Sequence, residues 1–176
     1  MSKRAEALAK HFEEANADLV AFIENCPDAA WTARCPAEGW TVAAASHHIA
    51  IDHPLLADLA RRVIAGEAMP ALDMGMVDEM NAQHAEEFAR CATGETLNLL
   101  RTNGGDTANF IRGLSDADLD RTAVIPWWGS TPVSAERVVE ELIHHIPEHL
   151  NSMREALASV AEARPAACAS ADARLA

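Results

Sequence analysis

Basic residues are scarce in this sequence of 176 residues. It has 14 Lys and Arg against 27 Asp and Glu, which gives a formal net charge of -13 at pH 7 with His neutral. Nucleic-acid backbones and anionic membrane surfaces are bound through clustered Lys and Arg. The charge balance therefore argues against a nucleic acid and against a membrane surface as partners.

Long apolar segments are missing as well. No run approaches the roughly 18 residues of a membrane-spanning helix. The basic residues Lys3 and Arg4 near the start are not followed by the apolar segment of a secretion signal. We therefore expect a cytoplasmic protein without a membrane segment. The hydrophobic fraction of 49% is that of a chain that folds around a core, and the length suits one domain.

Closely spaced cysteine pairs are absent too. The four cysteines are scattered along the chain, and no two have the C-x-x-C spacing of zinc ribbons and thioredoxin-type sites; they are Cys26, Cys35, Cys91 and Cys168. In a cytoplasmic protein such cysteines are free thiols. Nothing near Cys35 in the sequence lowers its pKa, so we interpret this cysteine as structural.

Helical periodicity is what the sequence has along most of its length. Apolar residues recur at spacings of three and four in four long segments, and these are residues 3–25, 41–65, 74–113 and 134–161. Glycines predict an interruption of the third segment, either near 92–94 or near 103–105. No alternating run is long enough to predict a strand.

Four long helices with apolar stripes bury those stripes most economically in an antiparallel-type bundle. We predict an all-α protein, a four-helix bundle with a long crossover connection before the last helix. The bundle domain is expected to span residues 1–163. Residues 164–176 are Ala-rich and polar and are expected to form a flexible tail.

Helical phase distinguishes the histidines of the last helix that face inward from the one that faces water. Each residue turns about 100° around the helix axis, and the apolar residues from Val139 to Val160 define one face. His149 lies within this face, and His145 lies at its edge one turn earlier. His144 lies on the opposite side and is expected to face water. An i,i+4 pair on one face can bring two rings to one ion.

The second helix adds one more inward imidazole. His48 lies within the apolar face of this helix, and Asp52 lies one turn further on, whereas His47 and His53 project elsewhere. Three imidazoles with an open fourth position suit a divalent metal, zinc in the first place and nickel as the alternative. Asp52 is a candidate acceptor that holds His48 in one tautomer.

Histidines that simply lie in the core are the competing interpretation. A single inward histidine usually finds hydrogen bonds in the core, but burying three imidazoles without a partner is costly. Pro147 lies between His145 and His149, removes one helical hydrogen bond and is expected to kink the helix. The sequence leaves both interpretations open.

Further side chains are candidates for positions around the ion. His84 shares a face with Phe88, and it is either a core histidine or a fourth ligand or acid/base group. Asn81, one turn earlier, is placed to hydrogen-bond a bound group. Trp127 and Trp128 either plug the end of the bundle or wall a pocket above the metal. Of these residues, His84 and Asn81 are the candidates for a catalytic role.

Two stretches of the sequence resemble a known family. Residues 39–50, GWTVAAASHHIA, resemble the opening of the second helix in the DinB/YfiT superfamily, especially in the branch of the mycothiol-dependent maleylpyruvate isomerases. Residues 129–150, a loop, a cap and an inward H-x-x-x-H, resemble the metal motif of the last helix in that family. Asn81 stands where many members carry an Asn. The resemblance covers about residues 5 to 160.

The resemblance implies a four-helix bundle with a long crossover and a divalent metal near one end. Carried over by position, the metal ligands are His48, His145 and His149. The maleylpyruvate isomerase branch has a Glu as the middle ligand, where this chain has His145. Members of the family often form homodimers. They include transferases and isomerases that use mycothiol, bacillithiol or glutathione as a low-molecular-weight thiol.

Three functions therefore compete. The first is a metal-dependent enzyme acting on a small molecule, either a thiol-dependent S-transferase or isomerase or a hydrolase that uses water on the metal. The second is a non-catalytic metal-binding module for stress response or dimerisation, with a closed shell in which His84 or Asp52 is the fourth ligand. The third is a helical protein with core histidines and no metal.

Overall fold

The computed structural model describes the backbone of residues 2–169 and the side chains up to residue 162. Its elements follow one another in the order α1 Lys3–Glu24, α2 Asp28–Trp31, α3 Val42–Ala65, α4 Met74–Glu87, α5 Thr93–Gly113, α6 Asp116–Leu119, β1 Thr122–Ala123, the 3-10 turn η1 Pro126–Trp128, β2 Val133–Ser134 and α7 Ala135–Ala169. The protein is therefore essentially all-α, as the periodicity predicts.

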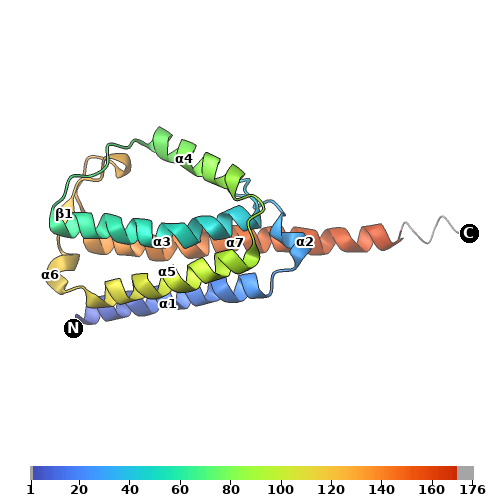
Figure 1. The fold of residues 1–176 in the computed structure, drawn as a ribbon, viewed down its shortest axis with the longest axis horizontal. Helices are drawn as coiled ribbons and strands as arrows, with labels where there is room; N and C mark the ends of the chain where they lie inside the picture. The colour runs from blue at the N-terminus through green and yellow to red at the C-terminus, as the bar shows by residue number, and fades with distance from the viewer. Residues whose placement is uncertain (1, 170–176) are drawn as a thin grey trace, which may run out of the picture.

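Four of these helices form the bundle. Helix α1 packs against α5 and α7, and α3 packs against the same two helices, so that α1, α5, α3 and α7 form a closed ring (Figure 1). The core between them consists of side chains such as Phe12, Ile49, Leu100 and Ile146, all of them buried. The predicted four-helix bundle is confirmed.

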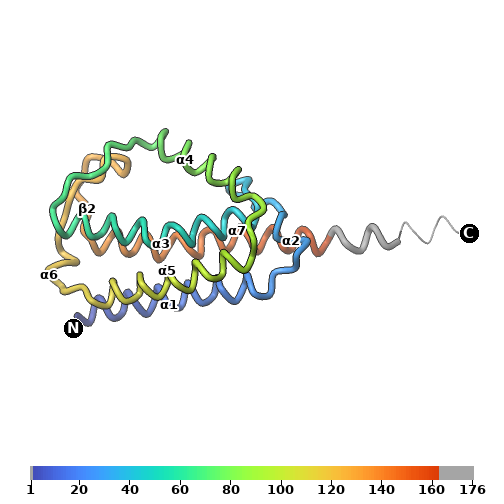
Figure 2. The backbone as a smooth tube through the Cα atoms, in the orientation of Figure 1, coloured from blue at the N-terminus to red at the C-terminus, as the bar shows by residue number. Residues whose placement is uncertain are grey.

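Two long connections join the bundle helices. The first contains α4, which returns the chain along the length of the bundle, so that α3 and α5 run in the same direction (Figure 2). The second, residues 114–134, precedes α7 and is long, as expected; it holds α6, η1 and both strands. The crossover that contains α4 was not foreseen from the sequence. The expected antiparallel arrangement is therefore wrong for the neighbouring helices α3 and α5.

Helix α4 lies apart from the bundle (Figure 1) and, among the bundle helices, packs chiefly on α3. None of its residues is buried, and Met74, Met76 and Met80 are exposed. Residues 74–113 were expected to form one interrupted helical segment of the bundle, and this expectation is wrong for the first half, which lies outside the bundle. The physical reason is that this half has too little apolar surface to compete for a place in the core.

Helix ends agree closely with the capping residues of the sequence. The Thr41 hydroxyl accepts a hydrogen bond from the backbone N–H of Ala44 at 3.1 Å and begins α3. Gly66 ends α3 in the left-handed conformation with φ 68°. The Ser134 hydroxyl accepts from the N–H of Arg137 at 3.1 Å at the start of α7. These ends fix where α3 and α7 place their histidines.

A short hairpin precedes the last helix. Thr122 pairs with Ser134 and Ala123 with Val133 in antiparallel register. The pairing closes a loop that contains η1 and its two tryptophans. The sequence did not predict these strands, because two residues are too few to show an alternating pattern.

Helix α7 is longer than expected. It extends to Ala169, past the predicted end near residue 161 and into the segment 164–176 expected to be flexible. Residues 170–176 lie outside the described part of the chain, so the flexibility of the tail stays a prediction. No helix among the described residues is both long enough and apolar enough to cross a membrane.

Candidate metal centre

Three histidines from two neighbouring helices meet inside the bundle. His48 comes from α3, and His145 and His149 come from α7. One ring nitrogen of each lies within 4.8 Å of the others, and the Nε2 atoms of His48 and His145 are 3.1 Å apart. Helical phase singled out the same three residues. The structure therefore brings together the predicted ligand set, and metal binding by it stays a prediction.

His149 is held in place by a carboxylate from the loop before α3. Its Nδ1 hydrogen-bonds to Oε1 of Glu38. The other oxygen, Oε2, accepts from the Ser152 hydroxyl at 2.6 Å, and this hydroxyl accepts from the Ala37 N–H at 3.1 Å. With Nδ1 as the donor, Nε2 of His149 is left with its lone pair free. Metal-binding histidines are commonly oriented in this way.

The hydrogen bonds also keep Glu38 ionised. Burial alone would raise the pKa of Glu38, but the hydrogen bonds from His149 and Ser152 outweigh burial and lower it below its ordinary value. Sequence analysis missed Glu38. The available signal was the rule that a ligating histidine donates its second nitrogen to a carboxylate, together with the position of Glu38 directly before Gly39 and Trp40.

Asp52 contacts two of the three histidines. Its Oδ2 lies 3.0 Å from Nε2 of His48 and 3.0 Å from Nε2 of His145. Burial favours the protonated acid, but the hydrogen bond from His145 and the adjacent imidazoles lower the pKa of Asp52 below its ordinary value. The carboxylate is therefore ionised at neutral pH. The carboxylate thus lies beside the Nε2 atoms of both histidines, the two atoms that face each other, whereas the sequence predicted contact with His48 alone.

His48 is neutral at neutral pH. Burial is the largest cause and lowers the pKa of His48 to about 4, although the charge of Asp52 opposes this shift. A neutral imidazole is the form that binds a metal, because the proton must leave the ligating nitrogen. Little proton competition is therefore expected at this ligand above about pH 5.

Trp40 packs against two histidines of the set. Its ring is stacked on His149 with centroids 5.8 Å apart and an interplanar angle of 17°, and it meets His48 edge-on at 5.1 Å. The indole thus restricts how both imidazoles can rotate. The contact of Trp40 with the histidines was not foreseen from the sequence.

His84 does not lie in the core. It is half-buried on α4, and its Nε2 is 3.3 Å from Nδ1 of His47. Its ring centroid is 5.7 Å from that of His48. The interpretation of His84 as a core histidine is therefore wrong, because α4 never enters the bundle. His84 is instead a neighbour of the three-histidine set.

The remaining histidines separate as phase predicts. His144 is exposed beside His145. His47 and His53 point away from the set but are buried. His47 is stacked on Phe88 with ring centroids 3.8 Å apart.

A cavity of about 380 Å³ opens beside the set. Its walls come from α3, α4, η1 and α7, and His48, Asp52 and His145 form part of them. Asn81 also lines this cavity, as expected for a residue that contacts a bound group. Of the two interpretations of Trp127 and Trp128, the structure favours the second, because both indoles form part of the cavity wall.

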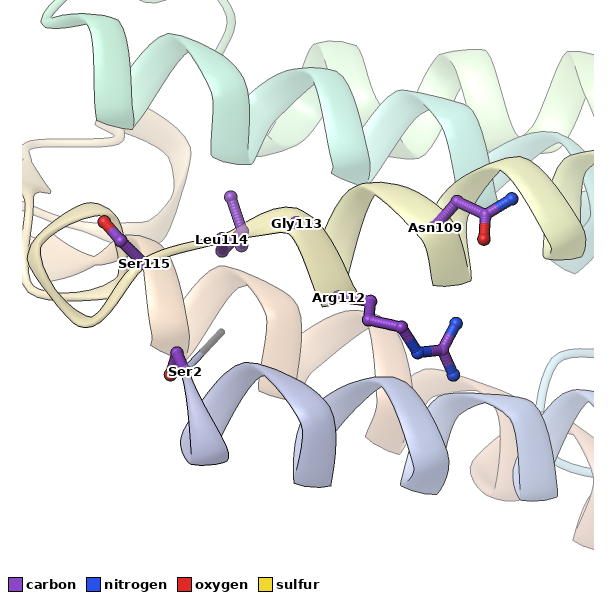
Figure 3. A pocket seen from close by; sticks show the side chains of 6 residues that line it. All are labelled: Ser2, Asn109, Arg112, Gly113, Leu114 and Ser115. Atoms are coloured by element: carbon purple, nitrogen blue, oxygen red, sulfur yellow. The ribbon is translucent and has the colours of Figure 1, made fainter.

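A second cavity, of about 460 Å³, lies where the start of α1 meets the end of α5 (Figure 3). None of the residues that line it is a histidine, a cysteine or a carboxylic acid. Its basic residue, Arg112, is held by Glu6 and Glu13, with closest N–O distances of 3.2 and 2.8 Å. This cavity therefore offers no candidate catalytic group.

The three cysteines whose side chains are described offer no activated thiolate. Burial is the main reason that the pKa of Cys35 rises to about 12, and it raises the pKa of Cys26 and Cys91 above the ordinary value. All three are free thiols. The interpretation of Cys35 as structural agrees with its burial. The side chain of Cys168 lies outside the described residues.

Comparisons with known proteins agree with this architecture. A family model described as the DinB superfamily matches residues 11–167. No curated protein matches the chain. Among solved structures, YfiT from Bacillus subtilis, described as a probable metal-dependent hydrolase with an unusual four-helix bundle topology, superposes with a TM-score of 0.75. The match covers 92% of this chain and 90% of that one at 20% identity, a level at which the likeness shows the fold alone.

Proposed function

The chain belongs to the DinB superfamily, and we propose that it is a divalent-metal-dependent enzyme whose ion is held by His48, His145 and His149. The donor set fits such an ion. Three imidazoles suit zinc or nickel. One of them, His149, is also oriented by an ionised carboxylate, because its Nδ1 hydrogen-bonds to Glu38.

The observation that carries the proposal is that the three-histidine set borders a cavity. His48 and His145 line the cavity of about 380 Å³, so a small molecule that enters it reaches the metal-binding nitrogens. Structural zinc sites are closed by four protein ligands, whereas catalytic sites keep a position open. A three-histidine set at the wall of a cavity is therefore typical of catalysis.

A divalent ion bound there would lower the pKa of a thiol or a water molecule beside it. Asp52 lines the same cavity, and its lowered pKa makes it a weak base. We assign it the role of orienting the nucleophile by accepting a hydrogen bond. Asn81, on the α4 wall, is placed to donate a hydrogen bond to the substrate.

The reaction class is the finer part of the proposal. The resemblance to thiol-dependent isomerases supports an S-transferase or isomerase that uses mycothiol, bacillithiol or glutathione. The fold likeness to YfiT, described as a probable metal-dependent hydrolase, supports hydrolysis as the second candidate. Both reactions need the same activation of a nucleophile at the histidines.

A non-catalytic metal-binding module is the alternative. It requires a fourth protein ligand that closes the shell. Asp52 is the nearest candidate, at 3.0 Å from two of the histidine nitrogens. His84 is a poorer one, because the described contact of its Nε2 is with His47.

Elemental analysis by plasma mass spectrometry tests the metal proposal. The tag-free protein is compared with the variants His149→Ala and His144→Ala. His144 is the matched control, since it lies on the same helix and is exposed. We expect about one zinc or nickel per chain in the parent and in His144→Ala, and none in His149→Ala. Absence of metal after reconstitution, or equal loss in both variants, overturns the proposal.

The quaternary state and the location rest on the resemblance and the composition. We propose a homodimer in the cytoplasm. Sedimentation equilibrium on the metal-loaded protein measures the mass, and a monomer at all concentrations contradicts the first part of this proposal.

A further inference from the structure

The cavity beside the histidines has mostly apolar walls. The apolar residues that line it include Leu55, Leu72, Met74, Met80, Trp127 and Trp128. Several of them remain exposed: Leu55 by 58%, Met80 by 56% and Trp128 by 37%. Large apolar side chains left exposed around a hollow mark a surface that a ligand covers.

The charged groups of the cavity are almost all acidic. Its lining includes the carboxylates of Asp52, Asp58 and Glu141, and Arg62 is the one basic residue among the described residues that line it. Nε of Arg62 is 2.9 Å from Oδ2 of Asp58, and Nη1 is 3.7 Å from Oε2 of Glu67. Arg62 is therefore already engaged by two carboxylates.

An anionic group far from the metal-binding end would find no partner here. An unpaired charge that leaves water for an apolar surface loses its hydration without compensation. The guanidinium of Arg137 contacts Glu141, a residue of the cavity wall, with 2.8 Å between Nη2 and Oε2, and is therefore already paired. An uncharged apolar group, in contrast, binds with a favourable free energy, because it removes the apolar surface of the indoles and thioethers from water.

We infer that this cavity takes a substrate with an apolar, uncharged body and discriminates against one that carries an anionic group away from its reacting end. The inference rests on the proposed function in one respect: the molecule in the cavity is the substrate that is attacked at the histidines. It does not concern the thiol co-substrate, since glutathione and bacillithiol carry carboxylates away from their thiol. It adds the substrate class, which neither the metal-binding residues nor the family assigns.

Two matched dyes test this selectivity. N-phenyl-1-naphthylamine and 8-anilino-1-naphthalenesulfonate share one aromatic body, and only the second carries a sulfonate. Their fluorescence is titrated on the metal-loaded protein and on the chelated protein. We expect one saturable site for the neutral dye and an affinity for the anionic dye lower by about tenfold or more. Equal or tighter binding of the anionic dye, or no saturable binding of the neutral dye, overturns the inference.

Substitutions locate the site. Met80→Ala is expected to lower the affinity for the neutral dye by about tenfold, because the protein loses the thioether that the bound dye covers. Met76→Ala is the control, since Met76 lies on the same helix and is 45% exposed but does not line the cavity. Leu55→Arg places a guanidinium on the exposed rim of the cavity. It is expected to reduce the difference in affinity between the neutral and the anionic dye. Equal effects of Met80→Ala and Met76→Ala contradict the proposed location.

The metal content of each sample separates this inference from the proposed function. If the protein prefers the neutral dye as expected but binds no metal, the metal proposal fails and the cavity selectivity stands. If one metal binds per chain but the anionic dye binds as well as the neutral one, the selectivity fails and the metal centre stands.

Discussion

Glu38 accepts a hydrogen bond from Nδ1 of His149 across 111 residues of sequence. The contact ties the loop before α3 to the middle of α7. It presents the other ring nitrogen to His48 and His145, and it places a negative charge behind an imidazole of the proposed metal site. Such a carboxylate raises the basicity of the imidazole and fixes its tautomer.

Glu38→Gln is therefore expected to lower metal affinity by about 10–100-fold without unfolding the chain. The amide still fills the space but does not carry the charge. Competition with a chromophoric chelator measures the affinity. Glu148→Gln is the matched control, since Glu148 is exposed beside His149 and should leave the affinity unchanged. A similar loss in both variants would show that overall charge, and not the contact with His149, sets the affinity.

Asp52→Asn distinguishes an open metal site from a closed one. If three histidines form the set, the variant retains one ion per chain, and the visible spectrum of the cobalt-substituted protein keeps its shape. Added thiol should perturb that spectrum in the parent, because a coordination position is open. A changed spectrum in Asp52→Asn, together with no response of the parent to thiol, would instead support the non-catalytic module with Asp52 as fourth ligand.

His53 makes the folded state sensitive to acid. It is only 1% exposed, its ring meets Phe12 edge-on at 4.9 Å, and neither ring nitrogen has a hydrogen-bond partner among the described residues. Burial lowers the pKa of His53 to about 4. The unfolded chain, with a pKa near 6.5, takes up this proton first as the pH falls. Stability is therefore complete above about pH 6.5 and is lost between about 6.5 and 4.

The expected loss from His53 is on the order of 3 kcal/mol over that window. In His53→Leu this part of the pH dependence disappears, and the stability at pH 8 is unchanged or higher, because no hydrogen bond is lost. Urea unfolding of the parent and the variant at pH 5 and pH 8 measures both effects. His11→Leu is the control, since His11 is exposed. An equal pH dependence in the parent and in His53→Leu would contradict the prediction.

The three candidate metal ligands could be predicted from the sequence because helical phase fixes side-chain direction. His48, His145 and His149 lie on faces that apolar neighbours define, and no knowledge of loops was needed to bring them together. Glu38 and Trp128 lie in a loop and a short 3-10 turn, where no period relates position to direction. Their contribution to the site depends on how the chain folds around it.

Helix membership in the bundle was harder to predict than helix formation. Residues 74–113 show helical signals throughout, but α4 leaves the core and α5 stays in it. Of the two expected breaks, the one near residue 92 is confirmed. The glycine pair Gly104 and Gly105 lies inside α5, because Gly104 provides the close approach that Asn16 of α1 requires.

These two glycines give a matched pair of predictions. Gly105 is exposed, and a Cβ there meets nothing within 4 Å, so Gly105→Ala should stabilise the protein by about 0.5–1 kcal/mol through helix propensity. A Cβ on Gly104 would overlap Nδ2 of Asn16 and lie 3.1 Å from its Cγ. Asn16 would then lose its 3.3 Å hydrogen bond to the carbonyl of Leu100.

Gly104→Ala is therefore expected to destabilise the protein by about 1 kcal/mol, opposite in sign to the same change one residue later. Urea unfolding midpoints at constant m-value measure both variants. The double variant Gly104→Ala with Asn16→Ala removes the overlapping side chain and should recover part of the loss. Stabilisation by both single substitutions would mean that α1 and α5 do not approach each other as closely at Gly104 as the packing requires.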